Sequence, residues 1–334
     1  MPDGPAPART RRGPGPAVAE VRVAVRRLLA ECRPERVLVA CSGGADSVAL
    51  AAAAAFEAPR LGIAAGLVTV DHGLQPGSAE RAAAVADLGR RLGLHPVEVR
   101  TVTVAGRNVE ASARAARYEA LAGAPTLLGH TLDDQAETVL LGLGRGSGPR
   151  SIAGMRPVDG PWLRPLLGVR RATTRAACAD QNLPVWEDPH NADPRFVRAR
   201  LRAEVLPLLE DVLAGGVAEA LARTADLLRE DLDALDELVP DVTDDTLDAA
   251  ALRGSPPAVR RRVLRGWLRD NGVPPVTAAH LRALDALVAD WHGQGAVALP
   301  SGLEAVRRSG RLHLADPPSG TAATRTGSGA QLRR

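Results

Sequence analysis

A turn that could bind phosphate lies at Ser42 to Ser47, "SGGADS", between an apolar run and an alanine-rich stretch. Glycines permit a tight turn and close approach of a ligand, and the first N–H groups of a following helix attract an anion. The sequence contains no lysine, so the binding groups here must be backbone N–H groups and hydroxyls. The GK[ST] of a Walker loop and the third glycine of a dinucleotide fingerprint are both missing. The pattern predicts a lysine-free phosphate cradle, with an ordinary serine-capped glycine turn as the alternative.

Polar residues also follow two other apolar runs, as Asp71–His72 and as Gly129–His130. Because the carboxyl ends of parallel strands meet at one edge of a sheet, we expect both pairs to lie beside the Ser42–Ser47 turn. His130, Asp134 and Glu137 are spaced to share one face of a helix start. A polar helix face usually means solvent, but at a strand end beside a phosphate turn it favours a binding site.

Arginine-rich segments form a second group of candidate residues. Glu110, Arg114, Arg117 and Tyr118 share one helical face, and "FVRARLR" contributes Arg198, Arg200 and Arg202. Surface ion pairing and a solvated basic helix are the simpler interpretations. Phosphate contact is the functional one, because the planar guanidinium group binds phosphate through two parallel hydrogen bonds.

Alternating elements must position these residues. We predict strands over 36–41, 64–73, 95–104 and 125–130, and helices over 18–29, 46–55, 79–92, 108–123 and 133–144. Strand–helix alternation predicts an α/β fold, a parallel sheet with helices on both faces. From Gly168 the pattern is mostly helical, interrupted by a loop over 183–196.

The domain organisation predicted from the sequence has five parts. They are a disordered tail over 1–16, a catalytic domain over 17–212, a helical connector over 213–242, a small α+β domain over 243–316 and a disordered tail over 317–334. In the small domain we expect helices near 256–270 and 277–291 and strands in "GAVAL" and "RLHLA".

Composition narrows the class of protein. No uncharged apolar segment of about 18 residues occurs, which argues against a membrane span. The cysteines, Cys32, Cys41 and Cys178, form no CxxC pair, so we expect a reducing cytoplasm. The net charge of +3 weakly favours an anionic partner. Aromatic residues make up 2% of the chain, so Leu, Val and Ala must build its cores.

The motifs together resemble a known family. SGGADS at a strand end resembles the PP-loop of the ATP pyrophosphatases, which have an adenine nucleotide alpha hydrolase-like fold. Residues ~36–207 as a whole resemble the tRNA(Ile)-lysidine synthetases, in a short form without the further C-terminal domain of longer members. The motifs that carry this resemblance are "DHGLQ" (71–75), "NVEASARAARYEAL" (108–121), "GHTLDDQAETVLLGLGRGSG" (129–148), "GMRP" (154–157) and "DPHNADPRFVRARLRAEVLP" (188–207).

The resemblance implies a reaction and its substrates. ATP would adenylate the wobble cytidine of the isoleucine tRNA with a CAU anticodon, pyrophosphate would leave, and free L-lysine would displace AMP to give lysidine. Mg²⁺ would accompany ATP. No membrane partner is implied, and a homodimer is compatible with the sequence.

The resemblance also implies roles for residues. Those implied for ATP are Ser42, Gly43, Gly44, Ala45, Asp46, Ser47, His72 and Gly129, with Asp46 and Asp134 for Mg²⁺. Those implied for catalysis or lysine binding are His130, Asp134, Glu137, Arg114 and Arg117. Contact with tRNA is expected from Arg198, Arg200, Arg202, Arg261 and Arg265, the last two on the helix near 256–270 that would serve the implied tRNA-binding domain.

Two positions depart from the family pattern, and other functions compete. Gln75 stands where arginine is common and Ala199 where asparagine is common, so contacts at these positions are expected to be weaker or supplied elsewhere. A tRNA 2-thiolating enzyme would need paired cysteines, and amide-forming relatives would not explain the basic segment 188–207. A non-catalytic tRNA-binding protein would not need intact SGGADS and DDQAE motifs.

Overall fold

The computed structural model describes residues 13–71, 73, 77–102, 119, 121, 123–146, 148–188, 193–240 and 244–316. The chain divides into two compact units, over residues 1–229 and 230–334. The predicted helix over 108–123, with Arg114 and Arg117, falls almost wholly outside the described residues, as do His72 and Gln75. Nowhere in the described ranges is there a helix with the length and apolarity that spanning a bilayer requires.

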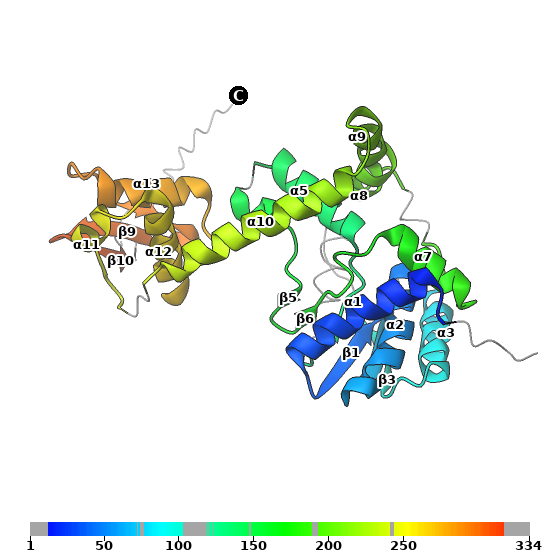
Figure 1. Cartoon of the computed structure of the whole chain (residues 1–334). Helices are drawn as coiled ribbons and strands as arrows, with labels where there is room; N and C mark the ends of the chain where they lie inside the picture. The colour runs from blue at the N-terminus through cyan, green and yellow to red at the C-terminus, as the bar shows by residue number, and fades with distance from the viewer. Residues whose placement is uncertain are drawn as a thin grey trace, which may run out of the picture. The chain divides into compact units, whose positions relative to one another are not determined.

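The first unit is built on a mostly parallel sheet (Figure 1). Its strands are β1 (Arg36–Ala40), β2 (Ala64–Asp71), β3 (Val97–Thr101), β4 (Thr126–Leu127), β5 (Val158–Asp159) and β6 (Trp162–Leu163). In the described residues their order is β3-β2-β1-β4-β6-β5, and only β5 pairs antiparallel. The four predicted strands are confirmed, whereas the two-residue strands β5 and β6 were too short for a sequence pattern to reveal.

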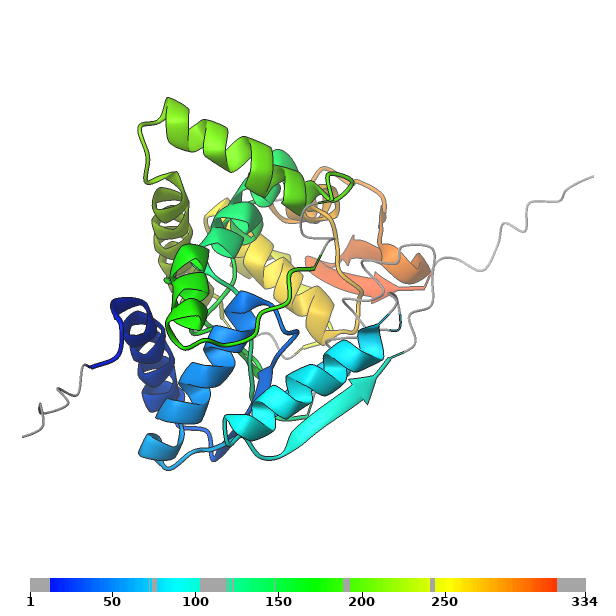
Figure 2. The same ribbon diagram turned by 90° about the vertical axis from the view of Figure 1, so that its right-hand side faces the viewer.

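One face of this sheet carries closely packed helices. They are α1 (Pro16–Cys32), α2 (Ala45–Glu57), α3 (Ser78–Arg91) and α7 (Arg171–Asp180). α2 packs against β1 and is flanked by α1 and α7, and Figure 2 shows α3 running beside β3. In α2, the stretch Val48–Ala54 is buried throughout. Small alanine side chains let neighbouring helices approach from several sides, so α2 is apolar all round.

The opposite face is apolar as well. Leu38, Val68 and Leu128 form a buried cluster there with Leu121. Of the predicted helix over 108–123, little beyond Leu121 is described, so the prediction that helices cover both faces is confirmed for one face and untested for the other.

The first unit continues in helices beyond the sheet. They are α5 (Leu132–Gly144), α6 (Pro149–Ile152), α8 (Val197–Arg200), a π-helical turn η3 (Leu201–Val205), α9 (Leu206–Val212) and α10 (Val217–Glu237). The short 3-10 turn η1 (Pro59–Leu61) precedes β2. The boundary between the two units falls within α10, the helix predicted as a connector.

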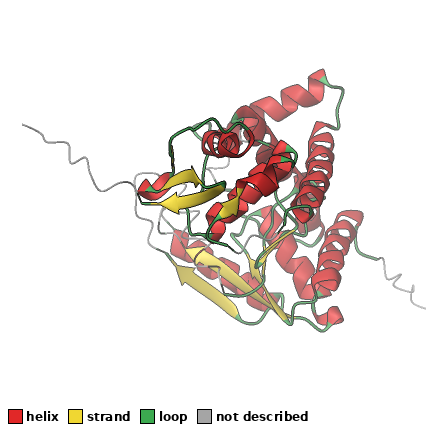
Figure 3. Cartoon of the chain, turned by 90° about the vertical axis from the view of Figure 1, so that its left-hand side faces the viewer, coloured by secondary structure: helices red, strands yellow, loops and turns green. Residues whose placement is uncertain are grey.

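The second unit is a small α+β fold whose strands appear yellow in Figure 3. Its elements are β7 (Leu247–Asp248), α11 (Ala249–Arg253), α12 (Pro257–Asp270), α13 (Ala278–Ala289), β8 (Val297–Ala298), η4 (Pro300–Gly302), β9 (Glu304–Arg308) and β10 (Arg311–Ala315). The described strands form an antiparallel sheet in the order β7-β10-β9-β8. Trp267, Leu264 and Leu312 anchor its core. Both predicted helices and both predicted strands are present.

Candidate active site

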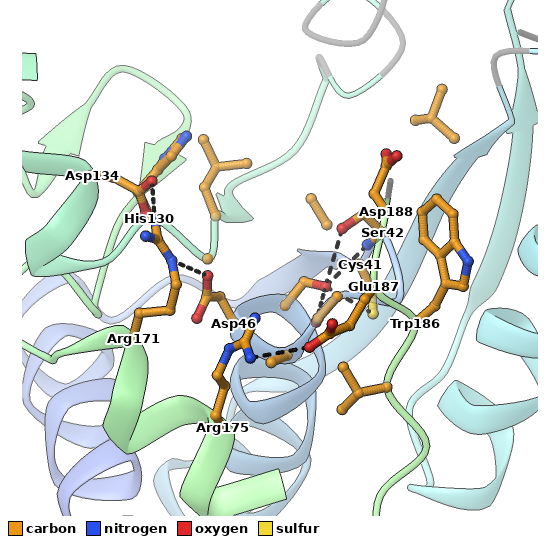
Figure 4. Close-up of a pocket in the computed structure, with 18 of the residues that line it drawn as sticks. Cys41, Ser42, Asp46, His130, Asp134, Arg171, Arg175, Trp186, Glu187 and Asp188 are labelled. Atoms are coloured by element: carbon orange, nitrogen blue, oxygen red, sulfur yellow. Dashed lines mark hydrogen bonds and ion pairs between the residues drawn. The ribbon is translucent and has the colours of Figure 1, made fainter. Parts of the chain in front are cut away.

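A cleft of about 470 Å³ opens at the carboxyl ends of β1 and β4 (Figure 4). It is bordered by the turn before α2, the start of α5, the start of α7 and the segment 185–188. The predicted site residues that line it are Ser42, Gly44, Ala45, Asp46, Ser47, Gly129, His130, Asp134 and Arg202. The expectation that separate strand-end motifs converge is therefore confirmed for the turn and for Gly129–His130.

Hydrogen bonds within the Ser42–Ser47 turn shape it. The Ser42 N–H donates to Ser47 Oγ at 3.2 Å, and Ser47 Oγ donates to the Gly44 carbonyl at 2.9 Å. Gly43 has a φ of +88°, a conformation that side chains disfavour. The Trp186 N–H donates to the Gly43 carbonyl at 2.9 Å, which ties the turn to the far wall of the cleft. α2 thus begins at a fixed, lysine-free turn, and its first N–H groups have no partner within the helix.

Gly129 lets the end of β4 lie against the start of α2. A Cβ atom at this position would lie 3.1 Å from the Ser47 nitrogen and 3.2 Å from the Asp46 carbonyl carbon. Both are backbone atoms, which cannot give way as a flexible side chain does. The glycine therefore sets the position of the helix start relative to His130.

Asp46 is the acidic residue of the turn, and it is tied to α7. Its Oδ1 accepts a hydrogen bond from Thr174, and its Oδ2 lies 3.4 Å from Arg171 Nε. Burial raises the pKa of Asp46, and the bond from Thr174 and the charge of Arg171 only partly oppose this. A cation placed beside Asp46 would reverse that effect, because it favours the ionised carboxylate.

Asp134 has a structural role at the start of α5. Its Oδ2 accepts from the Thr131 N–H and from Thr131 Oγ1, each at 2.7 Å, which completes a capping box. Its Oδ1 accepts from Arg171 Nη2, also at 2.7 Å. Burial acts to raise the pKa of Asp134, but Arg171 and the Thr131 bonds outweigh it and the pKa lies below its ordinary value. The carboxylate stays ionised and is held in place.

Glu137 is the anchor of an arginine cluster, not a solvent-facing group. Its side chain has 0% exposure. Oε1 lies 2.9 Å from Arg202 Nε and 3.4 Å from Arg171 Nη1, and Oε2 lies 3.4 Å from Arg198 Nη1. Glu137 therefore joins α5 to α7 and to the basic segment at 198–202.

Comparisons with known proteins show which family the chain resembles. Residues 18–209 match the family described as PP-loop domain, and residues 247–313 match the one described as TilS substrate binding domain. The chain is 54% identical to the tRNA(Ile)-lysidine synthase of Rhodococcus erythropolis over 90% of this chain and 96% of that one. It is 57% identical to that of Rhodococcus opacus, over 90% and 96% of the two chains.

The chain belongs to the tRNA(Ile)-lysidine synthase family. The Streptomyces coelicolor member is 52% identical over 90% of this chain and 98% of its own. Among solved structures, a U34-tRNA thiolase from Methanococcus maripaludis with a [4Fe-4S] cluster matches with a TM-score of 0.50. At 17% identity over 64% of this chain and 80% of that one, this likeness shows the shared fold.

Arg171 is the main residue of the cleft that sequence reasoning missed. It opens α7, and its backbone N–H donates to Asp133 Oδ2 at 2.7 Å. Its guanidinium contacts Asp46, Asp134 and Glu137, which come from two different helices. The only sequence signal was an arginine pair after a glycine, "GVRR", and nothing in that pattern reveals carboxylates brought in from elsewhere.

The segment 185–188 forms the opposite wall and was predicted only as a loop. Arg81 lies over the Trp186 ring, 4.4 Å from its centroid, a cation–π contact that fixes the ring. Glu187 pairs with Arg175 Nη1 at 3.0 Å near the rim of the cleft (Figure 4). In this chain the wall therefore adds an aromatic face and acidic groups opposite the Ser42–Ser47 turn.

Cys41 and Cys178 lie in positions unsuited to sulfur transfer. Cys41 ends β1 and donates to Ser47 Oγ at 3.6 Å, and Cys178 donates to the Ala45 carbonyl at 3.4 Å. Burial raises the pKa of both thiols, that of Cys178 to about 11. Both therefore remain protonated near neutral pH and serve as packing groups beside the turn.

The remaining predicted residues lie elsewhere. Arg200 pairs with Glu204 on an exposed surface. Position 199 is buried, and its alanine side chain offers no polar group. Arg261 lies in the second unit, where its Nε donates to Asp285 Oδ2 at 3.0 Å while the side chain keeps 45% exposure. Its neighbour Arg260 is buried against the same Asp285. Arg261, which was predicted to contact tRNA, thus helps Arg260 to hold α12 to α13.

The oxygen donors at the turn fit Mg²⁺ in one way. No group of three or more His, Cys, Asp or Glu side chains in the described ranges could enclose a metal ion. Mg²⁺ is commonly held by one or two carboxylates together with substrate phosphates. Asp46, at the helix start where phosphates would lie, fits that arrangement. Asp134 fits less well, because Thr131 and Arg171 already engage both of its oxygens.

Proposed function

We propose that this protein joins free L-lysine to C2 of the wobble cytidine in the CAU-anticodon isoleucine tRNA, with cleavage of ATP to AMP and pyrophosphate. The observation that carries the proposal is the lysine-free SGGADS turn, whose helix start, Gly129 and Asp46 face one cleft. Family membership supports ATP and tRNA as substrates.

The turn suits adenylation. Backbone N–H groups at the start of α2 and the Ser42 hydroxyl would hold the triphosphate, and Asp46 would hold the Mg²⁺ that accompanies it. Bound there, Mg²⁺ supplies charge neutralisation on the phosphates. The C2 oxygen of cytidine would attack the α-phosphorus, so an O–P bond forms while the bond to pyrophosphate breaks. Adenylation turns a poor leaving oxygen into a good one.

The second half of the reaction needs an uncharged amine. The lysine ε-amine attacks C2, AMP leaves with the oxygen, and the amine loses a proton to a base. His130, on the wall of the cleft at the end of β4, is the residue we assign to position or accept that proton. We assign recognition of the lysine ammonium to Asp134 rather than to Glu137. Asp134 lines the cleft, whereas Glu137 is fully buried among arginines.

Binding of tRNA would draw on the arginines. Arg198 and Arg202 pair with Glu137, and Arg202 borders the cleft, so we assign both to phosphates near the target base. Arg200, Arg261 and Arg265 would make phosphate contacts farther away. Contacts of this kind position the substrate and weaken with salt. We also assign contacts with the nucleotide or substrate phosphates to Arg114, Arg117 and His72, which lie outside the described residues.

The test is lysine transfer itself. Incubate the protein with ATP, Mg²⁺, isotope-labelled lysine and a transcript of the isoleucine tRNA, and analyse the wobble nucleoside by mass spectrometry. We expect labelled lysidine, with none on a transcript carrying uridine at the wobble position and none with Asp46→Asn. Sulfur incorporation, or tight tRNA binding without ATP cleavage, would overturn the proposal in favour of a thiolating enzyme or a binding protein.

A further inference from the structure

Arg171 occupies the centre of the carboxylates at the head of the cleft (Figure 4). Its Nε lies 3.4 Å from Asp46 Oδ2, its Nη2 lies 2.7 Å from Asp134 Oδ1, and its side chain is only 16% exposed. Each nitrogen of the guanidinium group thus faces a different carboxylate, with Glu137 as the third. The group does at this point what a bound cation would do.

The local charges balance without any added ion. The carboxylates that the Arg171 guanidinium group touches are Asp46, Asp134 and Glu137, and the guanidinium groups on them are those of Arg171, Arg198 and Arg202. Their formal charges cancel. The carboxylate of Glu137 is fully buried and the side chain of Asp134 is only 17% exposed, and charges with so little access to water persist only when they are paired. Any cation that joins Asp46 must therefore displace positive charge already present.

We propose that Arg171 is a resident cation that competes with the divalent metal for Asp46 and moves to the nucleotide phosphates when metal and ATP bind. This inference rests on the proposed function, which places Mg²⁺ and ATP at the turn. A divalent ion on Asp46 would repel the guanidinium 3.4 Å from the same carboxylate. The triphosphate at the adjacent helix start offers oxygens that a guanidinium binds through two parallel hydrogen bonds.

The proposal predicts effects of opposite sign for one substitution. Arg171→Met leaves the carboxylates with an excess negative charge, so Mn²⁺ should bind the nucleotide-free protein at least tenfold more tightly than it binds wild type. Mg²⁺–ATP should bind at least tenfold more weakly, because the phosphate contact is lost. A residue with a purely structural role would weaken both or neither. Free Mn²⁺ is counted by electron paramagnetic resonance, and nucleotide affinity is measured by calorimetry.

Arg175→Met is the matched control. Arg175 lies on the same helix one turn later and lines the same cleft, but it pairs with the exposed Glu187. Its loss should leave Mn²⁺ affinity unchanged. If Arg171→Met does not fold, Arg171→Lys serves instead, because the single nitrogen of lysine cannot span the carboxylates that Arg171 reaches with three separate nitrogens. We then expect Mn²⁺ affinity to rise at least threefold.

Unchanged or weaker Mn²⁺ binding in the foldable Arg171 variant overturns the proposal. Asp46→Asn separates this failure from a failure of the proposed function. If Asp46→Asn leaves Mn²⁺ binding intact in the presence of ATP, the metal does not sit on Asp46 and the assignment of the turn is wrong. If Asp46→Asn abolishes binding while the Arg171 variant behaves as wild type, only the resident-cation inference fails.

Discussion

Glu137 offers the sharpest test of how the cleft is held together. We expect Glu137→Gln to destabilise the first unit strongly, because it removes the negative charge from a fully buried group that faces Arg171, Arg198 and Arg202. Breaking a buried ion pair by removing one partner costs about 3–5 kcal/mol. The arginines are 16–38% exposed, so solvent screening lowers the expected cost to about 2–4 kcal/mol.

Thermal unfolding followed by circular dichroism measures this cost. For a domain of 150–250 residues, about 3 kcal/mol corresponds to a fall in the melting temperature of roughly 6–12 °C. Glu204→Gln is the control, since it removes the same charge from an exposed pair with Arg200 and should leave the melting temperature unchanged. Equal melting temperatures for the two variants would refute the anchoring role. A Glu137→Gln protein of wild-type stability that no longer saturates with lysine would instead make Glu137 the lysine site.

Other outcomes follow from the same structure. Gly129→Ala should lower both stability and ATP affinity, because its Cβ meets α2 backbone at 3.1 Å; Gly44→Ala should keep its stability, since its Cβ meets nothing closer than 3.8 Å, and lose only ATP affinity. Calorimetric titration with ATP and thermal melts on both variants test this, and equal losses of stability would contradict it. The pKa of Asp134 is lowered on folding, so its contribution to the free energy of unfolding is fully present above its ordinary pKa of 3.8. That contribution fades as pH falls through the lower folded value. The difference in urea stability between wild type and Asp134→Asn should therefore shrink below about pH 4, and a difference that grows there would be inconsistent with the capping geometry. Native protein at pH 8 should resist alkylation by iodoacetamide at Cys41 and Cys178, whose thiol pKa values burial raises, and rapid labelling mapped by peptide mass spectrometry would show those thiols to be accessible.

The fold of the first unit was predictable because its strands and helices carry strong local patterns. β1 and β2 are apolar runs that end in polar or glycine residues, and α2 and α3 follow directly. β5, β6, β7 and β9 were missed. The first three are two residues long, and "EAVRR" in β9 is as compatible with a helix as with a strand. Its pairing with β10 is a tertiary effect that overrides local preference.

The position of the Ser42–Ser47 turn between a strand and a helix was predictable for the same reason, and the ion-pair network around Asp134 and Glu137 was not. Spacing placed Asp134 and Glu137 on one helix face, which suggested two groups open to ligands. The structure instead gives them guanidinium partners from residues at least 34 positions away in the chain. Likewise Gln135 exchanges hydrogen bonds with the backbone of Met155, which ties the DDQAE and GMRP motifs together. No period in the sequence encodes such distant partners.

We propose above that ATP bound at the Ser42–Ser47 turn adenylates the tRNA before lysine enters the reaction. The direct measurement is to mix protein, Mg²⁺, ATP labelled in the α- and γ-phosphates and the isoleucine tRNA without lysine, and to separate the products. The account predicts a single turnover that releases labelled pyrophosphate and leaves the α-label on the tRNA, with label released as AMP only after lysine is added. Formation of ADP and inorganic phosphate, or pyrophosphate release that does not depend on tRNA, would contradict it.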